Sequence, residues 1–143
     1  MSTNQNKETA RRYYDEVLNQ GNLDVLDQLA GKEFDEHDPL PGQGTGLDGL
    51  RDRVNMLRTG LAGTYSIQDM VAEGDKVVVR WLNSGTNSGE FFGMPPTGRD
   101  FTMAGIDVIR FEDGKMAEHW HVVDQLALLI QLGVVELPGP PPQ

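Results

Sequence analysis

The sequence predicts an α+β fold in which helices come first along the chain and an antiparallel sheet follows. Apolar residues recur at the 3.6-residue spacing of amphipathic helices as far as Leu61. From residue 65 to residue 124 the period changes to two, in four runs of β-branched, aromatic or alternating residues. Helices followed by a strand meander are typical of separate helix and sheet layers, and not of a doubly wound parallel sheet.

The first helix is expected to begin at Glu8 and to end at Gly21. Its apolar face follows helical spacing through Ala10, Tyr13, Tyr14, Val17 and Leu18. Residues 2–6 are polar, and residues 1–6 are expected to fray.

Two more helices are expected before the strands. Asn22 can cap a short second helix, which ends at Gly31. The segment 34–49 holds two prolines and four glycines and is predicted to be a loop. A third amphipathic helix covers about residues 47–61.

Four strands and a closing helix are expected in the rest of the chain. The strands cover residues 65–73, 76–86, 101–111 and 115–124. Turn residues separate them at Gly74 and Gly114, and a long loop covers 88–99. The last helix covers residues 125–132.

Length and charge narrow the class of protein. The chain has 143 residues, 12 Lys+Arg against 22 Asp+Glu, and a formal charge of -10. We expect one domain over residues 1–133 and a proline-rich tail over 134–143. The negative charge disfavours nucleic acid and anionic membranes as partners. Cysteine is absent, which excludes thiolate chemistry. No apolar run resembles a signal sequence or a membrane span, so a cytoplasmic location is expected.

The segments GEFFGMPPTGRDF and IDVIRFEDGKMAEHWHVVDQLALLIQLG, with ARRYYDEVLNQGNLDVLDQL at the front, form a distinctive set of motifs. Over residues 8–133 the chain resembles the SnoaL-like polyketide cyclase and ester cyclase family of the nuclear transport factor 2-like superfamily. The resemblance implies a cone-shaped curved antiparallel sheet around the N-terminal helices, with one blind cavity. It also implies a homodimer or homotetramer formed through the outer face of the sheet, and acid/base catalysis of polyketide ester cyclisation without cofactor or metal.

The register of the hairpin around Gly114 decides which side chains share a face. With a two-residue loop at Asp113-Gly114, Asp107 would lie opposite Trp120 and away from the histidines. With Gly114 as a G1 bulge, Phe111 would oppose Lys115, and Asp107 would lie opposite His119 and beside His121. Alternation alone leaves both registers open, because a one-residue slip exchanges the faces. The family resemblance favours the second.

In that register His121, Asp107 and His119 form the candidate catalytic set. His121 would transfer a proton, Asp107 would orient the His121 ring, and His119 would donate to a developing oxyanion. Family members carry the aspartate and the histidine at these two positions exchanged, so a related acid/base reaction fits as well as aldol closure. His-x-His with a carboxylate could also ligate iron or manganese. Because the family works without them, no metal and no cofactor are expected.

The predicted ligand contacts are Tyr14, His37, Trp81, Phe91, Phe92, Met94, Met103 and Ile109. Core packing is the competing interpretation for Tyr14 and Trp81, and a solvated loop position is the competing one for His37. The predicted function is a cofactor-independent acid/base enzyme that acts on a carbonyl-bearing hydrophobic small molecule. The alternatives are a non-enzymatic ligand-binding protein, or a hydroxylase or isomerase, using the same cavity.

Overall fold

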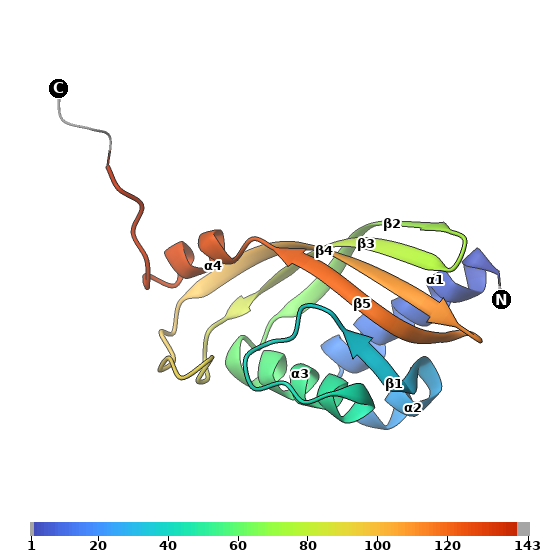
Figure 1. Ribbon diagram of the computed structural model, residues 1–143. Coiled ribbons are helices and arrows are strands. Elements are labelled where there is room, and N and C mark those ends of the chain that lie inside the picture. Colours follow the sequence, from blue (N-terminus) through green and yellow to red (C-terminus); the bar gives the residue numbers. More distant parts are fainter. Residues whose placement is uncertain (1, 140–143) are drawn as a thin grey trace.

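The computed structural model describes residues 2–139 and has the predicted α+β fold (Figure 1). Its elements are α1 (Thr3–Arg12), η1 (Tyr13–Asn19), η2 (Leu23–Val25), α2 (Leu26–Leu29), β1 (Ala30–Glu36), α3 (Gly46–Gly60), β2 (Thr64–Glu73), β3 (Lys76–Thr86), β4 (Asp100–Glu112), β5 (Lys115–Val123) and α4 (Gln125–Gln131). The strands form one sheet in the order β1-β5-β4-β3-β2, in which only β1 runs parallel to its neighbour. Residues 140–143 of the predicted tail lie outside the described residues.

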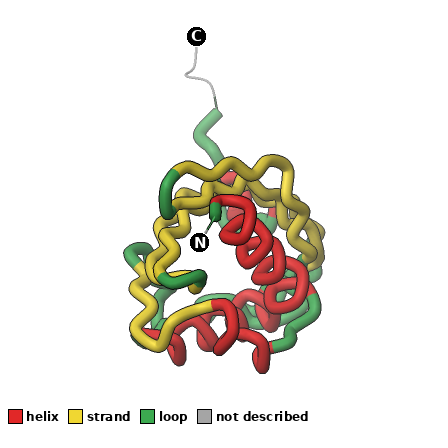
Figure 2. Tube along the Cα trace, turned by 90° about the vertical axis from the view of Figure 1, so that its right-hand side faces the viewer, coloured by secondary structure: helices red, strands yellow, loops and turns green. Residues whose placement is uncertain are grey.

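The sheet curves around one side of the molecule and the helices close the other side, as Figure 2 shows. The buried apolar side chains of the helices and of the inner sheet face form one core. From α3 onward, each helix and strand begins and ends within one residue of its predicted bounds. None of the helices described between residues 2 and 139 is long and apolar enough to cross a bilayer.

Helix α1 begins at Thr3, earlier than the predicted start at Glu8. The Oγ of Ser2 accepts a hydrogen bond from the backbone N–H of Gln5 at 3.1 Å, and the Gln5 side chain accepts one from the Ser2 N–H at 2.9 Å. This reciprocal pair is a capping box, which satisfies N–H groups that a helix end leaves free. Residues 3–6, which were expected to fray, are therefore helical.

A π-helical segment, η1, continues α1 without a break. It buries Tyr13, Tyr14, Val17 and Leu18, the apolar positions that the sequence assigned to one helix face. π-Helical turns are rare and are frequently found at functional sites. Here the segment places the hydroxyl of Tyr14 against β4.

The segment between η1 and α3 differs from the prediction. A 3₁₀ turn (η2) and one α-helical turn (α2) replace the single short helix, and the Asn22 side chain makes no capping hydrogen bond. Strand β1 then covers residues that were in part predicted to be loop. Only Ala30 and Phe34 of β1 are buried, because it is an edge strand with four charged residues. It therefore lacks the period-two alternation that marks a half-buried strand.

The hairpin between β4 and β5 has a two-residue turn, so the predicted G1-bulge register is wrong. Asp113 and Gly114 both have positive φ, 51° and 78°, as a type I′ turn requires, and Glu112 pairs with Lys115. Asn and Asp tolerate this conformation better than other residues with a side chain, and Gly adopts it freely.

A β-bulge then shifts the register by one residue. Phe111 pairs with Met116 and Arg110 with Glu118, so Ala117 is the extra residue on β5. Beyond the bulge Asp107 pairs with His121, and His119 lies opposite Ile109. The shared face of Asp107, His119 and His121 is thus confirmed, although Asp107 lies opposite His121 and not opposite His119.

The loop between β3 and β4 is held in place by Asn87, which is 2 % exposed. Its side-chain amide donates to the carbonyls of Gly60 and Gly89 at 2.9 and 3.0 Å. Its side-chain oxygen accepts from the backbone N–H and the hydroxyl of Thr97, both at 2.9 Å. These bonds fix the loop against the end of α3 and position the aromatic side chains at its tip.

Candidate active site

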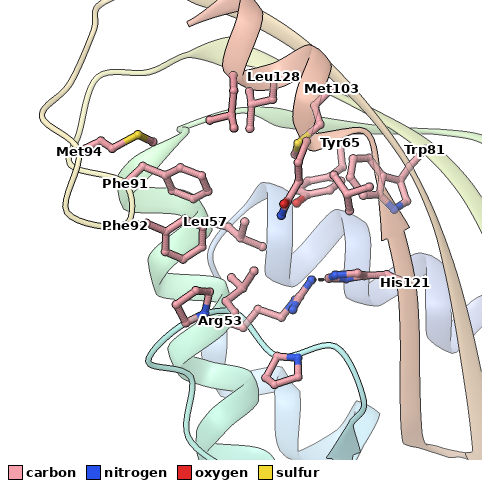
Figure 3. Close-up of a pocket in the computed structure, with 16 residues that line it drawn as sticks. Arg53, Leu57, Tyr65, Trp81, Phe91, Phe92, Met94, Met103, His121 and Leu128 are labelled. Atoms are coloured by element: carbon pink, nitrogen blue, oxygen red, sulfur yellow. Dashed lines mark hydrogen bonds between the residues drawn. The ribbon is translucent and has the colours of Figure 1, made fainter. Parts of the chain in front are cut away.

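A cavity of about 370 Å³ lies between the inner sheet face, α3, α4 and the loop before β4 (Figure 3). It is lined by Pro39, Leu40, Pro41, Arg53, Leu57, Tyr65, Trp81, Phe91, Phe92, Met94, Met103, His121, Val123, Gln125, Leu128 and Leu129. This volume and the mostly apolar lining are typical of small-molecule sites. The titratable side chains in the lining are Arg53, Tyr65 and His121. Burial raises the pKa of Tyr65, so its hydroxyl stays protonated at neutral pH.

Asp107 lies behind the cavity wall and is 6 % exposed. Its Oδ2 accepts hydrogen bonds from the Tyr14 hydroxyl and, at 3.0 Å, from the indole N–H of Trp81. Its Oδ1 is 3.0 Å from Nε2 of His119. Burial opposes the charge, but the charge and hydrogen bonds of His119 and the Tyr14 hydrogen bond outweigh it and lower the pKa of Asp107. The aspartate is therefore ionised.

His119 lies between two carboxylates. Its Nδ1 is 2.6 Å from Oε1 of Glu36 on β1, and its Nε2 contacts Asp107 on β4. Burial disfavours the imidazolium, yet Asp107 and Glu36 together raise the pKa of His119 to about 9. Both ring N–H groups of the charged form donate to these carboxylates, so the ring is fixed on both sides.

His121 has a different environment, because its ring lines the cavity. Its Nδ1 is 2.7 Å from Nη2 of Arg53, the contact drawn in Figure 3. Since a guanidinium only donates, Nδ1 is the acceptor, and the neutral ring carries its proton on Nε2. Burial, the charge of Arg53 and the charge of His119 all lower the pKa of His121. At neutral pH the imidazole is therefore uncharged, and it can take up a proton at Nδ1 once Arg53 no longer donates to that nitrogen.

The structure divides the sequence-predicted residues into two groups. Trp81, Phe91, Phe92, Met94 and Met103 lie in the cavity lining with His121, and Figure 3 shows Phe91, Phe92 and Met94 on the side away from His121.

The others lie outside the lining. Tyr14, Asp107 and His119 form the buried network behind the wall. Ile109 lies in the core beside His119, and both line a separate and much smaller cavity. His37 stacks on Trp120 with ring centroids 4.5 Å apart and lies 3.0 Å from a carboxylate oxygen of Glu118.

Two residues of the site were not found from the sequence. Arg53 lies on the apolar face of α3, where Leu50, Val54 and Leu57 are also buried, and Glu36 lies at the end of the unpredicted strand β1. A charged residue at a core-facing helix position is uncommon, and this was the available signal for Arg53. Glu36 offers no such signal, because it lies in the segment 34–49 that the sequence predicts to be a loop.

Asp107, His119 and His121 could in principle bind a cation, since one ligand atom from each lies within 4.8 Å of the others. Their hydrogen bonds oppose this use. Both ring nitrogens of His119 contact carboxylates, and Nδ1 of His121 faces the Arg53 guanidinium. A second such group, Asp35, His37 and Glu118, is more exposed, and Glu118 is also paired with Arg110. Neither group has the free donor set that a transition metal requires.

A curved sheet closed by helices around an internal cavity is the nuclear transport factor 2-like fold, which defines the class of protein. Within that class, residues 8–132 match the family described as SnoaL-like polyketide cyclase. The chain belongs to this family. No curated protein sequence matches it significantly.

Solved structures agree with this assignment. TsrD from Streptomyces laurentii is 29% identical with a TM-score of 0.85, over 94% of this chain and 99% of that one. IdmH from Streptomyces antibioticus, a proposed polyketide cyclase, is 32% identical with a TM-score of 0.78, over 91% of this chain and 99% of that one. AclR from Streptomyces galilaeus, a proposed hydroxylase, is 24% identical with a TM-score of 0.77, over 94% of this chain and all of that one, and shares the fold.

Proposed function

We propose that the chain is a cofactor-independent acid/base enzyme that moves a proton on a carbonyl-bearing hydrophobic small molecule, as a cyclase of the SnoaL-like type would. The observation that carries the proposal is the imidazole of His121 in the wall of an apolar cavity, 2.7 Å from a buried guanidinium. A base whose pKa is lowered from the usual value of histidine by burial and by the charge of Arg53 is neutral at pH 7, and the adjacent positive charge suits removal of a proton α to a carbonyl.

Each charged residue has a part in this proposal. The Arg53 guanidinium turns from Nδ1 of His121 to the carbonyl oxygen of the substrate, where it stabilises the negative charge that develops. Nδ1 is then free to take the proton from carbon and return it. The oxyanion role that the sequence suggested for His119 fits Arg53 better, because both N–H groups of His119 donate to carboxylates behind the wall. Asp107 orients the ring of His119. Because His119 and His121 lie on the same strand, β5, this contact also helps to hold β5 in position.

Deuterium exchange at carbon tests the proposal without knowledge of the natural substrate. The protein is incubated in D2O with aryl alkyl ketones and β-keto esters, and loss of the α-proton signal is followed by NMR. We expect His121→Ala to slow exchange by about a hundredfold, the lower end of the usual contribution of a general base. Lys76→Ala, an exposed change at the start of β3, is the control and should exchange like the wild type. Equal rates in the wild type and His121→Ala would contradict the assignment.

A ligand-binding protein without catalysis is the second candidate, and one observation favours it. The Asp107–His119 pair is buried and its hydrogen bonds are saturated, as expected of a structural support. Such a protein would bind the same ketones, visible as chemical-shift changes of the His121 ring, yet would exchange no α-proton above the rate in buffer.

We also propose that the chain assembles as a homodimer or homotetramer through the outer face of the sheet. An apolar row crosses four strands there, since Val71 pairs with Val78, Val78 with Val108 and Val108 with Trp120. On the same face Val122 is 77 % exposed, and exposed apolar patches of this kind favour association. Sedimentation velocity should show an oligomer for the wild type and a monomer for Val122→Glu. A monomeric wild type at micromolar concentration would exclude this interface.

A further inference from the structure

Arg53 is the least expected residue in the cavity wall. It is 7 % exposed and shares the core-facing side of α3 with Val54 and Leu57. A buried cation is costly unless it is closely paired and hydrogen-bonded. The partners of Arg53 therefore show whether its charge is already balanced within the protein.

The contacts of Arg53 with carboxylate and carbonyl oxygens are long. Its Nη1 is 3.5 Å from Oε1 of Glu36, 3.5 Å from the carbonyl of Asp38 and 3.4 Å from the side-chain oxygen of Gln43. Glu36 lies nearer to a second cation, at 2.6 Å from Nδ1 of His119. Among residues 2–139, the one short contact of the guanidinium is with a neutral partner, Nδ1 of His121, at 2.7 Å.

Surface arginines of the same chain are paired more closely than Arg53. Arg80 lies 2.5 Å from a carboxylate oxygen of Asp69, and Arg12 lies 2.5 Å from one of Glu16. A close carboxylate partner matters more to a buried charge than to an exposed one. If stability alone decided, the buried Arg53 would therefore be paired more closely than the surface arginines, and the opposite is found. The guanidinium fork of Arg53, which fits two carboxylate oxygens at once, is left without a carboxylate of its own.

The rest of the cavity limits what could supply that carboxylate. Leu57, Phe91, Met103 and Leu128 make its wall apolar, and Figure 3 shows Phe91 on the far side from the contact between Arg53 and His121. A ligand that satisfies both regions has a compact apolar body and one anionic end.

We propose that Arg53 is a carboxylate-binding residue, and that the ligand of this cavity is a small hydrophobic organic acid whose carboxylate takes the Arg53 N–H groups from Nδ1 of His121. The inference rests on the proposed function in using the same cavity and the same guanidinium, which would hold either a carboxylate or a developing oxyanion. Binding also has a chemical consequence, because Nδ1 then loses its donor and becomes free to accept a proton. Neutralisation of the Arg53 charge removes one cause of the lowered pKa of His121, so this pKa should rise on binding.

Matched pairs of ligands test the proposal by NMR on the full-length protein. The probes are 3-phenylpropanoate and hexanoate, each compared with its uncharged primary amide. We expect the acids to bind at least about tenfold more tightly than the amides, as charge-assisted hydrogen bonds to guanidinium imply. The ¹⁵N shift of His121 Nδ1 should move with the acid and not with the amide, and the His121 titration should shift to higher pH.

Two variants show whether Arg53 is the cause. Arg53→Met should abolish the preference for the acid, whereas Arg53→Lys, which keeps a charge but not the fork, should retain part of it. Arg51→Met, on the same helix and outside the cavity lining, is the matched control and should keep the full preference. If Arg53→Met does not fold, Arg53→Lys alone decides, through a preference smaller than that of the wild type.

Equal binding of acid and amide, no binding of either, or an undiminished preference in the Arg53 variants would overturn the proposal. Failure of the proposed function is separable from these outcomes, because it appears as absent α-proton exchange with ketones in a protein that still prefers the acids.

Discussion

Replacing Asp107 by alanine is expected to lower the free energy of unfolding by about 3–5 kcal/mol, the usual consequence of removing one partner of a buried ion pair. The change leaves the Tyr14 hydroxyl, the Trp81 indole N–H and Nε2 of His119 without their shared acceptor. It also leaves the His119 charge with Glu36 as its nearest carboxylate, next to the charge of Arg53. Urea unfolding followed by fluorescence measures the loss.

Two further variants separate the ion pair from the general effect of losing a carboxylate. Asp107→Asn keeps the shape and one acceptor oxygen but turns an amide N–H toward a donor, so its loss should be intermediate. Asp69→Ala removes an exposed carboxylate that pairs with Arg80, and it should change stability by about 1 kcal/mol or less. A loss of that small size in Asp107→Ala would show that the buried network does not stabilise the fold.

The hairpin that carries Asp107 shows how far the sequence could specify the site. The dipeptide Asp113-Gly114 predicted a turn at the correct place, and alternation predicted two strands. Neither signal could predict the bulge at Ala117, because a bulge adds one residue without altering composition or turn signals. The family resemblance predicted that both histidines share a sheet face with Asp107. It did not predict that His121 pairs with Asp107 and His119 with Ile109.

Charge placement in the site was beyond the sequence for a different reason. Glu36 and His119 are 83 residues apart, and they meet because an edge strand runs parallel to β5. Arg53 reaches His121 from a helix 68 residues earlier in the chain. Periodicity describes neighbours along one element, so it finds the apolar face of α3 but cannot state which strand that face meets. Contacts of this kind follow from topology.

The same network makes stability depend on pH above neutrality. His119 has a pKa of about 9 in the folded protein against 6.5 for an unperturbed histidine, so the folded state holds this proton more tightly than the unfolded state. Its contribution is fully present below pH 6.5 and is lost as the pH rises through about 9. The loss should be on the order of 3 kcal/mol. Because the pKa of His121 is lowered from 6.5, that ring is neutral throughout this interval and does not contribute to the change.

Urea unfolding at several pH values between 6 and 9.5 measures this dependence, and an NMR titration of the His119 ring gives its pKa directly. Two carboxylates raise the pKa of His119, Asp107 on β4 and Glu36 on β1, and burial opposes them. The matched variant His119→Gln keeps a hydrogen-bonding side chain but does not titrate, so its stability should vary much less across the same interval. If the wild type and His119→Gln lose stability in parallel, the proton on His119 is not the cause. A ring that titrates near 6.5 would lead to the same conclusion, because the two carboxylates would then not hold an imidazolium between them.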